Sequence, residues 1–470
     1  MTHRVNRRRF FRDSALAGFS IYIVQNSIGA ESKSPNEKLN IACIGCGGKG
    51  AGDTADAAKE NLVALCDVDE ARAARSFKAH PDVKRYKDFR RMFDEMGKSI
   101  DAVTVSTPDH IHAPAAMMAM AMGKHVFVQK PMAHSVFEAR SMTEAARKYK
   151  VASQMGNQGT ASNGLRRAVE LLHAGIIGPA KELHVWTNRP IWPQGMDRPS
   201  EEEPVPETLD WNLWLGPAPK RPYNHVYLPF AWRGWYDFGT GALGDMACHT
   251  LNMPFWGLKL GYPTSVAAQV GESLKPEAYP DWSIIHYEFP AREGLPPLTM
   301  AWYDGRKKSA ADRETDQATA KAKAGRLKGG GSGTPNRPPR EMFGFEGDEQ
   351  VSGSGVLIIG EKGKLYSPGD NGGNWQFLPK GLAEDAEKIG ETIPRSPGHF
   401  QEWVDACKGG QPAMSNFNYA GKLTEVVVLG CVAQRLPGQK IEWDGPNMKA
   451  VNCPEAEKLI RPEIPKAWWV

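Results

Sequence analysis

Cysteine is scarce in this chain of 470 residues, which contains only seven. An odd number of cysteines in so long a chain does not form the disulfide framework that small secreted domains use. Cys43 and Cys46 have C-x-x-C spacing, but no second pair lies near enough in the sequence to complete a zinc site. We therefore expect buried thiols and predict no metal site.

The chain also lacks a large excess of charge of either sign, since it has 58 lysines and arginines and 54 aspartates and glutamates. The whole formal net charge of +4 arises in residues 1–30, which hold five arginines and one aspartate. Because a nucleic-acid-binding domain carries a basic surface, nucleic acid is not the expected partner. The length and the hydrophobic content of 41% are those of a soluble globular protein with two or three domains.

A long apolar run is absent from the N-terminal segment, residues 1–30, because four polar residues interrupt it. A membrane span needs about 20 continuous apolar residues, so a stable span is not expected here. The arginine-rich stretch 7–12 precedes the apolar part, and Ile28-Gly29-Ala30 has the small residues of a cleavage site. The segment resembles a twin-arginine export signal, which carries folded proteins across a membrane, often with a cofactor inside. We expect an exported, periplasmic protein; the alternative is a cytoplasmic protein with a disordered tail.

Glycines cluster where the chain continues with "LNIACIGCGGKGAGDTADAAKE". The apolar run 41–44 predicts a buried parallel strand, and an Ala-rich helix follows. Between them, Gly45 suits a tight turn, Gly47 lets the backbone approach a pyrophosphate, and Gly50 lets helix and strand pack closely. The helix N-terminus favours the phosphates. The predicted phosphate-binding turn comprises Gly45, Cys46, Gly47, Gly48, Lys49 and Gly50.

The next apolar run, "NLVALCD", ends in Asp67. A carboxylate at the tip of a second strand can accept both ribose hydroxyls and repels a 2′-phosphate, so we predict NAD and favour it over NADP. The alternative role for Asp67 is the N-cap of a helix that begins near Asp69. Strand and helix signals then alternate to about residue 155. We predict a doubly wound Rossmann domain with a parallel sheet over residues 36–155, in a chain of the α/β class.

A polar stripe interrupts the otherwise apolar segment "GDMACHTLN", residues 244–252. Asp245, His249 and Asn252 fall on one line of a predicted helix whose remaining residues would be buried, so the stripe should face an internal cleft. Removing a hydride from a secondary alcohol requires a base for the hydroxyl proton, and the imidazole of His249 suits that role. Asp245 could orient the ring. A helix-surface pair and a metal site with His110 or His112 are the alternatives.

The stretches "VTVSTPDHIHA", "HVFVQKPMA" and "GALGDMACH" carry a family resemblance. With the closing stretch "SNFNYAGKLTEVVVLGCVA", they resemble the glucose-fructose oxidoreductase and inositol dehydrogenase family (Gfo/Idh/MocA). The resemblance implies a Rossmann domain, then a C-terminal α/β domain with a large, open, mostly antiparallel sheet. It also implies hydride transfer at a secondary alcohol of a sugar, sugar derivative or cyclitol.

Residue by residue, the resemblance implies that Lys130, Asp245 and His249 form the catalytic set. It further implies a group of residues lining the cofactor: Thr107, Pro108, His110, His112, Gln129 and Lys130. Gln129 departs from the family, which has a glutamate at this position. The neutral amide can still form hydrogen bonds, but it removes a carboxylate that could hold Lys130 charged.

Residues 156–460 are expected to form the second domain, for substrate binding and for assembly as a dimer or tetramer. The run "FAWRGWYDFG", just before the stripe, combines aromatic faces with charged groups, which suits a sugar. Arg233, Trp235 and Asp237 are the candidate substrate-binding residues, with a core corner as the alternative. Residues 306–340 hold ten basic and three acidic residues and no apolar period, which predicts a basic, low-complexity, mobile insert.

The predicted export and the predicted NAD cofactor together limit the kinds of reaction that the protein could catalyse. Free NAD is not assured outside the cytoplasm, so an exported enzyme must hold NAD tightly and regenerate it in place. We expect an oxidoreductase that couples two sugar reactions. The alternatives are an NAD-dependent glycosidase that uses transient oxidation and elimination, and a non-catalytic glycan-binding protein on a Rossmann scaffold.

Overall fold

The computed structural model describes residues 37–272, 274–322, 331–345 and 347–470. The predicted export signal, residues 1–30, lies outside these residues, as does 323–330 of the basic insert. Within the described ranges, no helix combines the length and apolar character needed to cross a membrane.

The first unit is a parallel sheet with helices on both faces, as the alternating signals predicted. Its elements are β1 (Asn40–Ile44), α2 (Lys49–Ala57), β2 (Asn61–Cys66), α3 (Glu70–Ala79), β3 (Lys84–Tyr86), α4 (Phe89–Met96), η1 (Gly97–Ser99), β4 (Ala102–Val105), α5 (Asp109–Ala121), β5 (His125–Val128), α6 (Val136–Tyr149) and β6 (Ser153–Met155). The strand order is β3-β2-β1-β4-β5-β6, so the direction of winding reverses between β1 and β4. Ligands bind at such a reversal, beyond the carboxyl ends of the strands.

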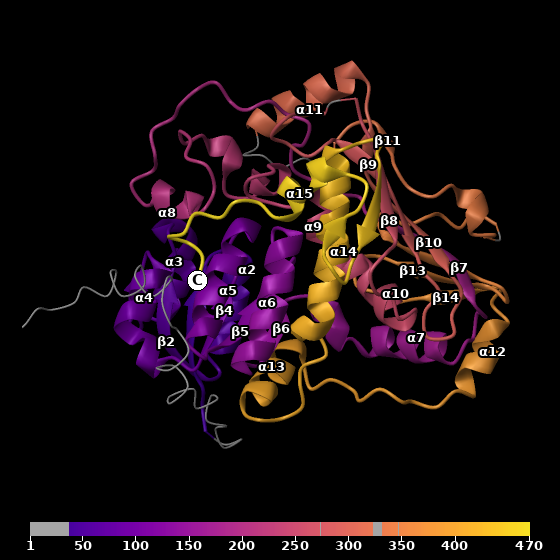
Figure 1. Ribbon diagram of the computed structural model, residues 1–470, viewed down its shortest axis with the longest axis horizontal. Coiled ribbons are helices and arrows are strands. Elements are labelled where there is room, and N and C mark those ends of the chain that lie inside the picture. Colours follow the sequence, from indigo (N-terminus) through magenta and orange to yellow (C-terminus); the bar gives the residue numbers. More distant parts are fainter. Residues whose placement is uncertain (1–36, 273, 323–330, 346) are drawn as a thin grey trace, which may run out of the picture.

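The second unit is a ten-stranded sheet with its own helices (Figure 1). Its first part contains η2 (Gln158–Ala161), α7 (Asn163–His173), β7 (Ala180–Trp186), α8 (Trp211–Leu215), η3 (His225–Tyr227), η4 (Ala231–Gly234), α9 (Gly241–Thr250), α10 (Asn252–Gly257), β8 (Ser265–Val270), β9 (Trp282–Phe289) and β10 (Leu298–Lys307). Its second part contains α11 (Ala310–Ala322), β11 (Thr334–Pro335), η6 (Arg340–Met342), β12 (Gly355–Gly360), β13 (Lys364–Pro368), β14 (Gln376–Leu378), α12 (Leu382–Glu387), α13 (His399–Cys407), α14 (Phe417–Arg435), β15 (Lys440–Asp444), β16 (Lys449–Ala450) and α15 (Pro454–Ile460).

The strand pairing in this sheet is mostly antiparallel, which confirms the expected fold class. The order is β14-β13-β12-β7-β10-β9-β8-β15-β16, and β11 pairs with β10. The exception is β7, which runs parallel to β10, with Thr299 opposite Glu182. A parallel pair needs a long crossover connection, and the chain between these two strands contains α9, the helix of the polar stripe.

The division at residue 155 does not separate the two units completely in space. Helix α13, from the second half of the chain, packs on the first sheet, where the Trp403 ring lies 5.7 Å from that of Phe127. Trp403 is fully buried in the same cluster as β1 and β2. Since β6 is followed in sequence by the second unit, no local pattern could show that α13 returns to cover the first.

The polar stripe lies on two helices rather than one. Helix α9 ends at Thr250, and α10 begins at Asn252. Asn252 is fully buried; its Nδ2 donates to Thr160 Oγ1 at 2.9 Å, and its Oδ1 accepts from the Tyr419 hydroxyl at 2.7 Å. Asn252 therefore belongs to a structural hydrogen-bond network, and only Asp245 and His249 remain as candidates for chemistry.

The insert 306–340 differs from the mobile loop that its composition predicted. β10 continues through Lys307, and α11 follows. Ser309 and Asp312 cap this helix reciprocally, since Ser309 N donates to the Asp312 carboxylate at 3.0 Å and Asp312 N donates to Ser309 Oγ at 3.2 Å. The Lys308–Asp316 ion pair, 2.8 Å long and largely buried, stabilises the segment. The capping pattern is present in the sequence, but we predicted no helix there because the segment has no apolar period.

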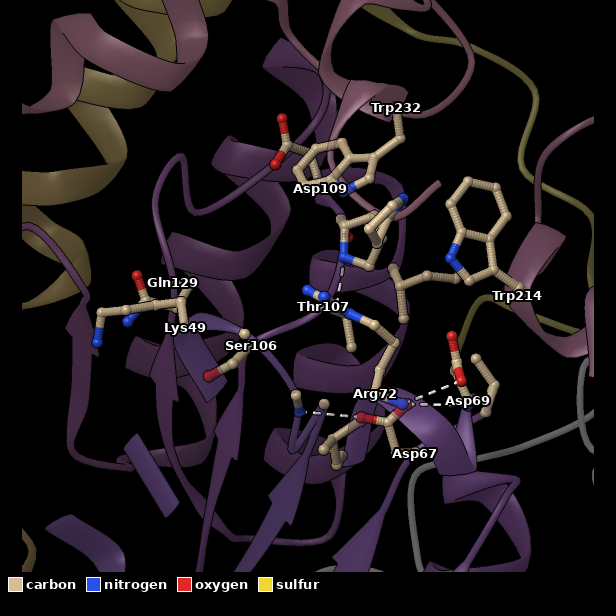
Figure 2. A pocket seen from close by; sticks show the side chains of 18 of the residues that line it. Lys49, Asp67, Asp69, Arg72, Ser106, Thr107, Asp109, Gln129, Trp214 and Trp232 are labelled. Atoms are coloured by element: carbon tan, nitrogen blue, oxygen red, sulfur yellow. Dashed lines mark hydrogen bonds between the residues drawn. The ribbon is translucent and has the colours of Figure 1, made fainter. Parts of the chain in front are cut away.

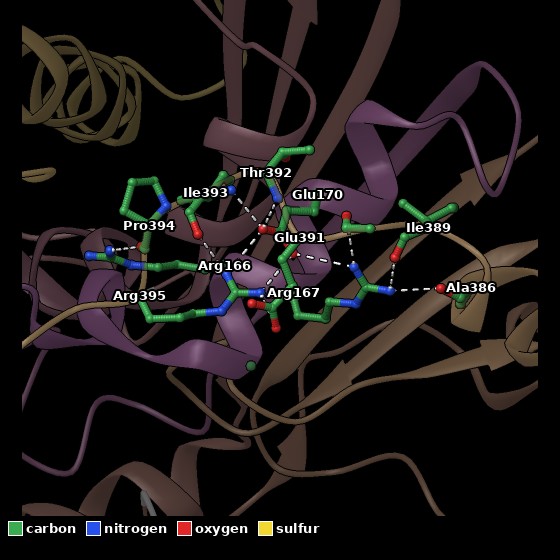
Figure 3. A network of polar contacts seen from close by, with 12 residues as sticks. Arg166, Arg167, Glu170, Ala386, Ile389, Glu391, Thr392, Ile393, Pro394 and Arg395 are labelled. Carbon is green, nitrogen blue, oxygen red and sulfur yellow. Dashed lines mark hydrogen bonds and ion pairs between the residues drawn. The ribbon is translucent and has the colours of Figure 1, made fainter.

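A buried ionic network joins α7 to the segment that leads into α13 (Figure 3). The Glu170 side chain, fully buried, accepts from the backbone N–H groups of Thr392 and Ile393, each at 2.8 Å, and pairs with Arg395 at 2.9 Å. Arg166 on the same helix pairs with Glu402 of α13. These contacts stabilise the connection that carries α13 back to the first unit.

Candidate active site

The glycine turn at the end of β1 requires glycine at three positions for steric reasons. Gly45 has φ +82°, in the left-handed region that favours glycine. A Cβ on Gly47 would lie 2.8 Å from the Arg72 carbonyl oxygen, and a Cβ on Gly50 would overlap the carbonyl of Gly45. Close packing against the protein's own backbone therefore excludes a side chain at these positions, and Gly45, Gly47 and Gly48 line a cavity at the start of α2.

Asp67 lies at the carboxyl end of β2 and contacts this turn directly. Its Oδ2 accepts from the backbone N–H of Cys46 at 2.7 Å and of Gly47 at 3.2 Å. Burial raises the pKa of Asp67, and hydrogen bonds from the backbone oppose that rise. The N-cap of α3 is Asp69, which accepts from Arg72 N. The N-cap alternative for Asp67 is thus wrong; its Oδ1 accepts from Asp69 N at 3.0 Å, and the residue lines the candidate ligand cavity.

A cavity of about 490 Å³ connects these groups to the helix of the stripe. Figure 2 shows Asp67, Asp69 and Arg72 at one end and Asp109 and Trp232 at the other. The predicted residues that line it are Gly45, Gly47, Gly48, Lys49, Asp67, Thr107, Pro108, Gln129, Lys130, Arg233 and His249. One cavity therefore contains the glycine turn and two members of the predicted catalytic set, Lys130 and His249.

Three side chains form an ion cluster at the far end. Lys130 Nζ donates to Asp245 Oδ1 at 2.8 Å and to the Asp245 backbone carbonyl at 2.7 Å. Arg233 Nε donates to the same Oδ1 at 2.8 Å. Burial alone would raise the pKa of Asp245, but the two cations and their hydrogen bonds outweigh it and hold the pKa well below its usual range. Asp245 is therefore a carboxylate that neutralises one of two cations.

His249 follows one turn later on α9 and lines the same cavity. Burial, with Lys130 nearby, lowers the pKa of His249 to about 3, so the ring is neutral. Its Nδ1 is shut off from solvent and has no hydrogen-bond partner within the described residues. The predicted role of Asp245 in orienting this ring is not seen, because the Asp245 carboxylate is bound to Lys130 and Arg233 instead.

Gln129, where the sequence departs from the family, faces a carboxylate from another element. Its Nε2 donates to Asp53 Oδ2 at 2.8 Å, and Ser106 Oγ donates to the same oxygen at 2.7 Å. Lys49 pairs with the other oxygen of Asp53. Asp53 is only 2% exposed. A glutamate at position 129 would place two carboxylates in contact, which explains the amide here.

His110 and His112 lie behind the cavity wall rather than in it. His110 contacts the carbonyls of Trp214 and Phe238, at 3.0 and 3.2 Å, and His112 contacts those of Thr107 and Pro131, each at 2.8 Å. Both are buried, and burial lowers their pKa to about 3 and about 4. The prediction that these two histidines line the cavity is therefore wrong. They bind the backbone of the loops that line it.

Among the predicted substrate-binding residues, only Arg233 lines the cavity. Its guanidinium lies between two rings, 4.3 Å from Trp232 and 4.5 Å from Phe230. Trp235 is 2% exposed in an aromatic cluster, and Asp237 pairs with the buried Arg221. For Trp235 the core-corner alternative is correct. The local run of residues could not distinguish these positions because the partners of Trp235 and Asp237 come from other segments, an aromatic cluster and Arg221.

The sequence motifs did not indicate several residues that line the cavity. Asp109, at the start of α5, is 3% exposed, and burial raises its pKa to about 6. Its position after Thr107-Pro108 was a usable signal. Trp468, eight residues after the end of α15, also lines the cavity but lies far from every motif in the sequence. Only tertiary packing brings it there.

The cavity fits a dinucleotide better than a metal ion. The glycine cradle, the acidic residue at the end of β2 and the open carboxyl edge of the sheet suit a pyrophosphate and a ribose. Among the described residues, no group of three or more His, Cys, Asp or Glu side chains is arranged to hold a metal. Cys43 and Cys46 are buried free thiols.

Comparisons with known proteins agree with this assignment. A sequence model of an oxidoreductase family with an NAD-binding Rossmann fold matches residues 39–157, and the model of that family's C-terminal α/β domain matches residues 186–292. The described glycine turn and Asp67 lie inside the first match, and Asp245 and His249 inside the second. The chain therefore carries an NAD-binding Rossmann domain.

Individual relatives cover parts of the chain. An uncharacterised oxidoreductase of Streptococcus pneumoniae is 34% identical over 136 residues, 28% of this chain and 34% of that protein. The 2,7-anhydro-N-acetylneuraminate hydratase of Escherichia coli is 32% identical over 130 residues, 28% of this chain and 32% of that protein. The chain thus matches about a third of the length of these two relatives.

A solved structure extends the likeness in fold. The WlbA dehydrogenase of Bordetella pertussis, in complex with NADH and UDP-GlcNAcA, superposes with a TM-score of 0.56 at 16% identity, over 87% of this chain and 98% of that one. At this identity the likeness concerns the fold, and it includes both domains.

Proposed function

The chain belongs to the Gfo/Idh/MocA oxidoreductase family in both of its domains, and from that premise we propose that it oxidises a secondary alcohol of a sugar, sugar derivative or cyclitol, with NAD held tightly. The observation that carries this proposal is the neutral His249, which lines the NAD cavity beside the ion cluster of Lys130, Asp245 and Arg233.

Lys130 and His249 have separate roles in removing the proton from the substrate hydroxyl. An ammonium group has three N–H donors, and Lys130 uses two of them on Asp245, which leaves one for the substrate oxygen. That donor stabilises the negative charge that develops on the oxygen. His249 takes the hydroxyl proton; because Nδ1 is shut off from solvent, Nε2 is the nitrogen left to face the substrate. NAD, when bound, supplies the hydride acceptor.

Arg233 and the aromatic side chains would bind the sugar. Trp214, Phe230 and Trp232 line the cavity, and such faces suit the C–H faces of a sugar ring. Two cations, Lys130 and Arg233, share the single carboxylate of Asp245, so this three-residue cluster carries a net positive charge.

Export through a twin-arginine-type signal in residues 1–30 remains part of the proposal. An exported enzyme with tightly held NAD must complete its redox cycle without exchanging the cofactor. A coupled oxidation and reduction of two sugars would do so. Assembly into a homo-oligomer through the open sheet is also proposed.

A transient-oxidation mechanism is the second candidate, because the relative from Escherichia coli is a hydratase of an anhydro sugar, a reaction with no net redox change. Oxidation of one carbon to a carbonyl would acidify the neighbouring C–H, and loss of that proton would eliminate the glycosidic oxygen and leave a double bond. Water would then add across the double bond, and reduction of the carbonyl with the same hydride would close the cycle with no net redox change. Solvent deuterium at the neighbouring carbon of the product distinguishes this route from coupled sugar oxidation.

The test begins with the protein from the periplasmic fraction of cells that express the full chain. We expect mass spectrometry to find the N-terminal segment removed and NAD bound in stoichiometric amount. Near-ultraviolet absorbance of reduced nicotinamide should appear when sugars are added, and should appear far more slowly in His249→Ala. NAD binding without reduction by any sugar would favour the glycan-binding protein, and an unprocessed cytoplasmic chain would remove the export proposal.

A further inference from the structure

The last ten residues leave the second unit and return to the Rossmann domain (Figure 1). They follow α15, and Trp468 N closes a turn by donating to the Pro465 carbonyl at 2.8 Å. This C-terminal tail, residues 461–470, therefore connects the end of the chain to the domain that binds the dinucleotide.

Two tryptophans anchor the tail. The Trp468 ring lies 5.9 Å from the ring of Phe89, and the Arg90 guanidinium lies 4.1 Å from the Trp468 ring. Trp469 contacts Phe137 at 5.5 Å. Both tryptophans are half-buried and pack against the main core. Since Phe89 and Arg90 begin α4 and Phe137 begins α6, the tail is fixed at two separate points.

Trp468 lines the same cavity as Asp67, at its Asp67 end. The neighbouring wall comes from the loop between β3 and α4, where Lys87, Asp88 and Phe89 also line the cavity. In a Rossmann domain the carboxylate after the second strand binds the adenosine ribose, so the adenine ring lies beside it. Trp468 therefore lines the part of the cavity beside which an adenine ring is expected.

We propose that Trp468 is a cofactor-binding residue that covers the adenosine end of the NAD site, so that NAD leaves only when the tail lifts. This inference rests on the NAD binding of the proposed function, but not on any sugar reaction. It gives a physical reason for slow NAD exchange, because dissociation requires breaking the contacts of Trp468 with Phe89 and Arg90.

The test measures the dissociation rate of NADH by displacement with excess NAD, followed through nicotinamide fluorescence and without any sugar. Trp468→Ala should release NADH about tenfold faster, the effect expected when an aromatic contact is lost. Trp468→Phe should stay within about twofold of the wild type. Trp256→Ala removes a half-buried tryptophan on α10, outside the cavity, and should leave the rate unchanged.

A second measurement locates the effect at the adenosine end. Trp468→Ala should weaken binding of ADP-ribose about tenfold and leave binding of nicotinamide mononucleotide unchanged. If Trp468→Ala does not fold, Trp468→Leu, which keeps an apolar contact with Phe89, is measured in the same two assays.

Each outcome separates this inference from the proposed function. Unchanged NADH release from the folded variants overturns the role of Trp468 and leaves the sugar reaction untouched. Faster release in a protein that oxidises no sugar supports the tail and contradicts the proposed reaction. A wild type that binds no NADH overturns both.

Discussion

Gln129 lines the cofactor cavity and contacts the buried Asp53 behind it, with 2.8 Å between Gln129 Nε2 and Asp53 Oδ2. A carboxylate only accepts hydrogen bonds, so this contact turns the amide nitrogen toward Asp53 and leaves the amide oxygen for another partner. The pair thus provides one negative charge and one oriented amide on two different elements, α2 and the end of β5.

This pairing predicts that Gln129→Glu weakens NADH binding about tenfold, because two carboxylates in contact cannot both ionise in a buried site. The double variant Asp53→Asn with Gln129→Glu should recover affinity, since it exchanges the amide and the carboxylate. Fluorescence titration with NADH measures both. Normal affinity in Gln129→Glu, or no recovery in the double variant, would show that the contact does not matter for binding.

Replacing His249 should slow catalysis without affecting the cofactor. We expect His249→Ala to lower the rate of hydride transfer by roughly 10²–10⁴-fold, as for loss of a general base. The dissociation constant of NADH should stay within about twofold. Single-turnover kinetics with the identified sugar gives the rate, and a wild-type rate in this variant would remove His249 from the mechanism.

The pH dependence of kcat/KM should not show the usual titration of a histidine. Burial holds the pKa of His249 near 3, so the ring is neutral from about pH 5 to pH 8. An exposed histidine would change its charge within this range. An acid limb near pH 6.5 that disappears in His249→Gln would contradict the buried, neutral ring.

Asp245→Asn should destabilise the folded protein by about 3 kcal/mol at pH 7, since it leaves Lys130 and Arg233 close together without a counter-charge. The pKa of Asp245 is held below its unfolded value, so the wild-type advantage is present at neutral pH and declines as the pH falls below about 4. Asp56→Asn, in an exposed pair with Lys59, is the matched control and should change stability by less than about 1 kcal/mol. Chemical denaturation at several pH values measures both variants.

Glu170 should make a second, separate contribution to acid unfolding. Burial raises its pKa, but the hydrogen bonds from Arg395, Ile393 and Thr392 outweigh burial and lower the pKa to about 2. The stabilisation is complete above the unfolded value of about 4.5 and is lost as the pH falls toward 2, in total about 3 kcal/mol. Glu170→Gln should remove that pH dependence from the unfolding free energy; an unchanged slope between pH 4.5 and 2 would refute it.

The sequence was sufficient for the Rossmann domain because its signals are local. Gly45 has a left-handed φ and Gly50 lies against the Gly45 carbonyl, both within one strand-turn-helix unit, and Asp67 lies at the end of the next strand. The capping box at Ser135 and Glu138 is local in the same way, and both of its hydrogen bonds form. Steric and capping rules act over a few residues, so each could be recognised without the fold.

Only the tertiary structure decided the partners inside the site. The i, i+4 spacing allowed Asp245 to orient His249, but two cations from distant segments, Lys130 and Arg233, bind its carboxylate more strongly than a neutral ring could. Likewise, Asp53 reaches Gln129 across 76 residues, and Trp468 reaches the cavity from the end of the chain. Sequence periodicity determines which face a side chain occupies, whereas charge pairing and packing between remote segments determine what that side chain meets.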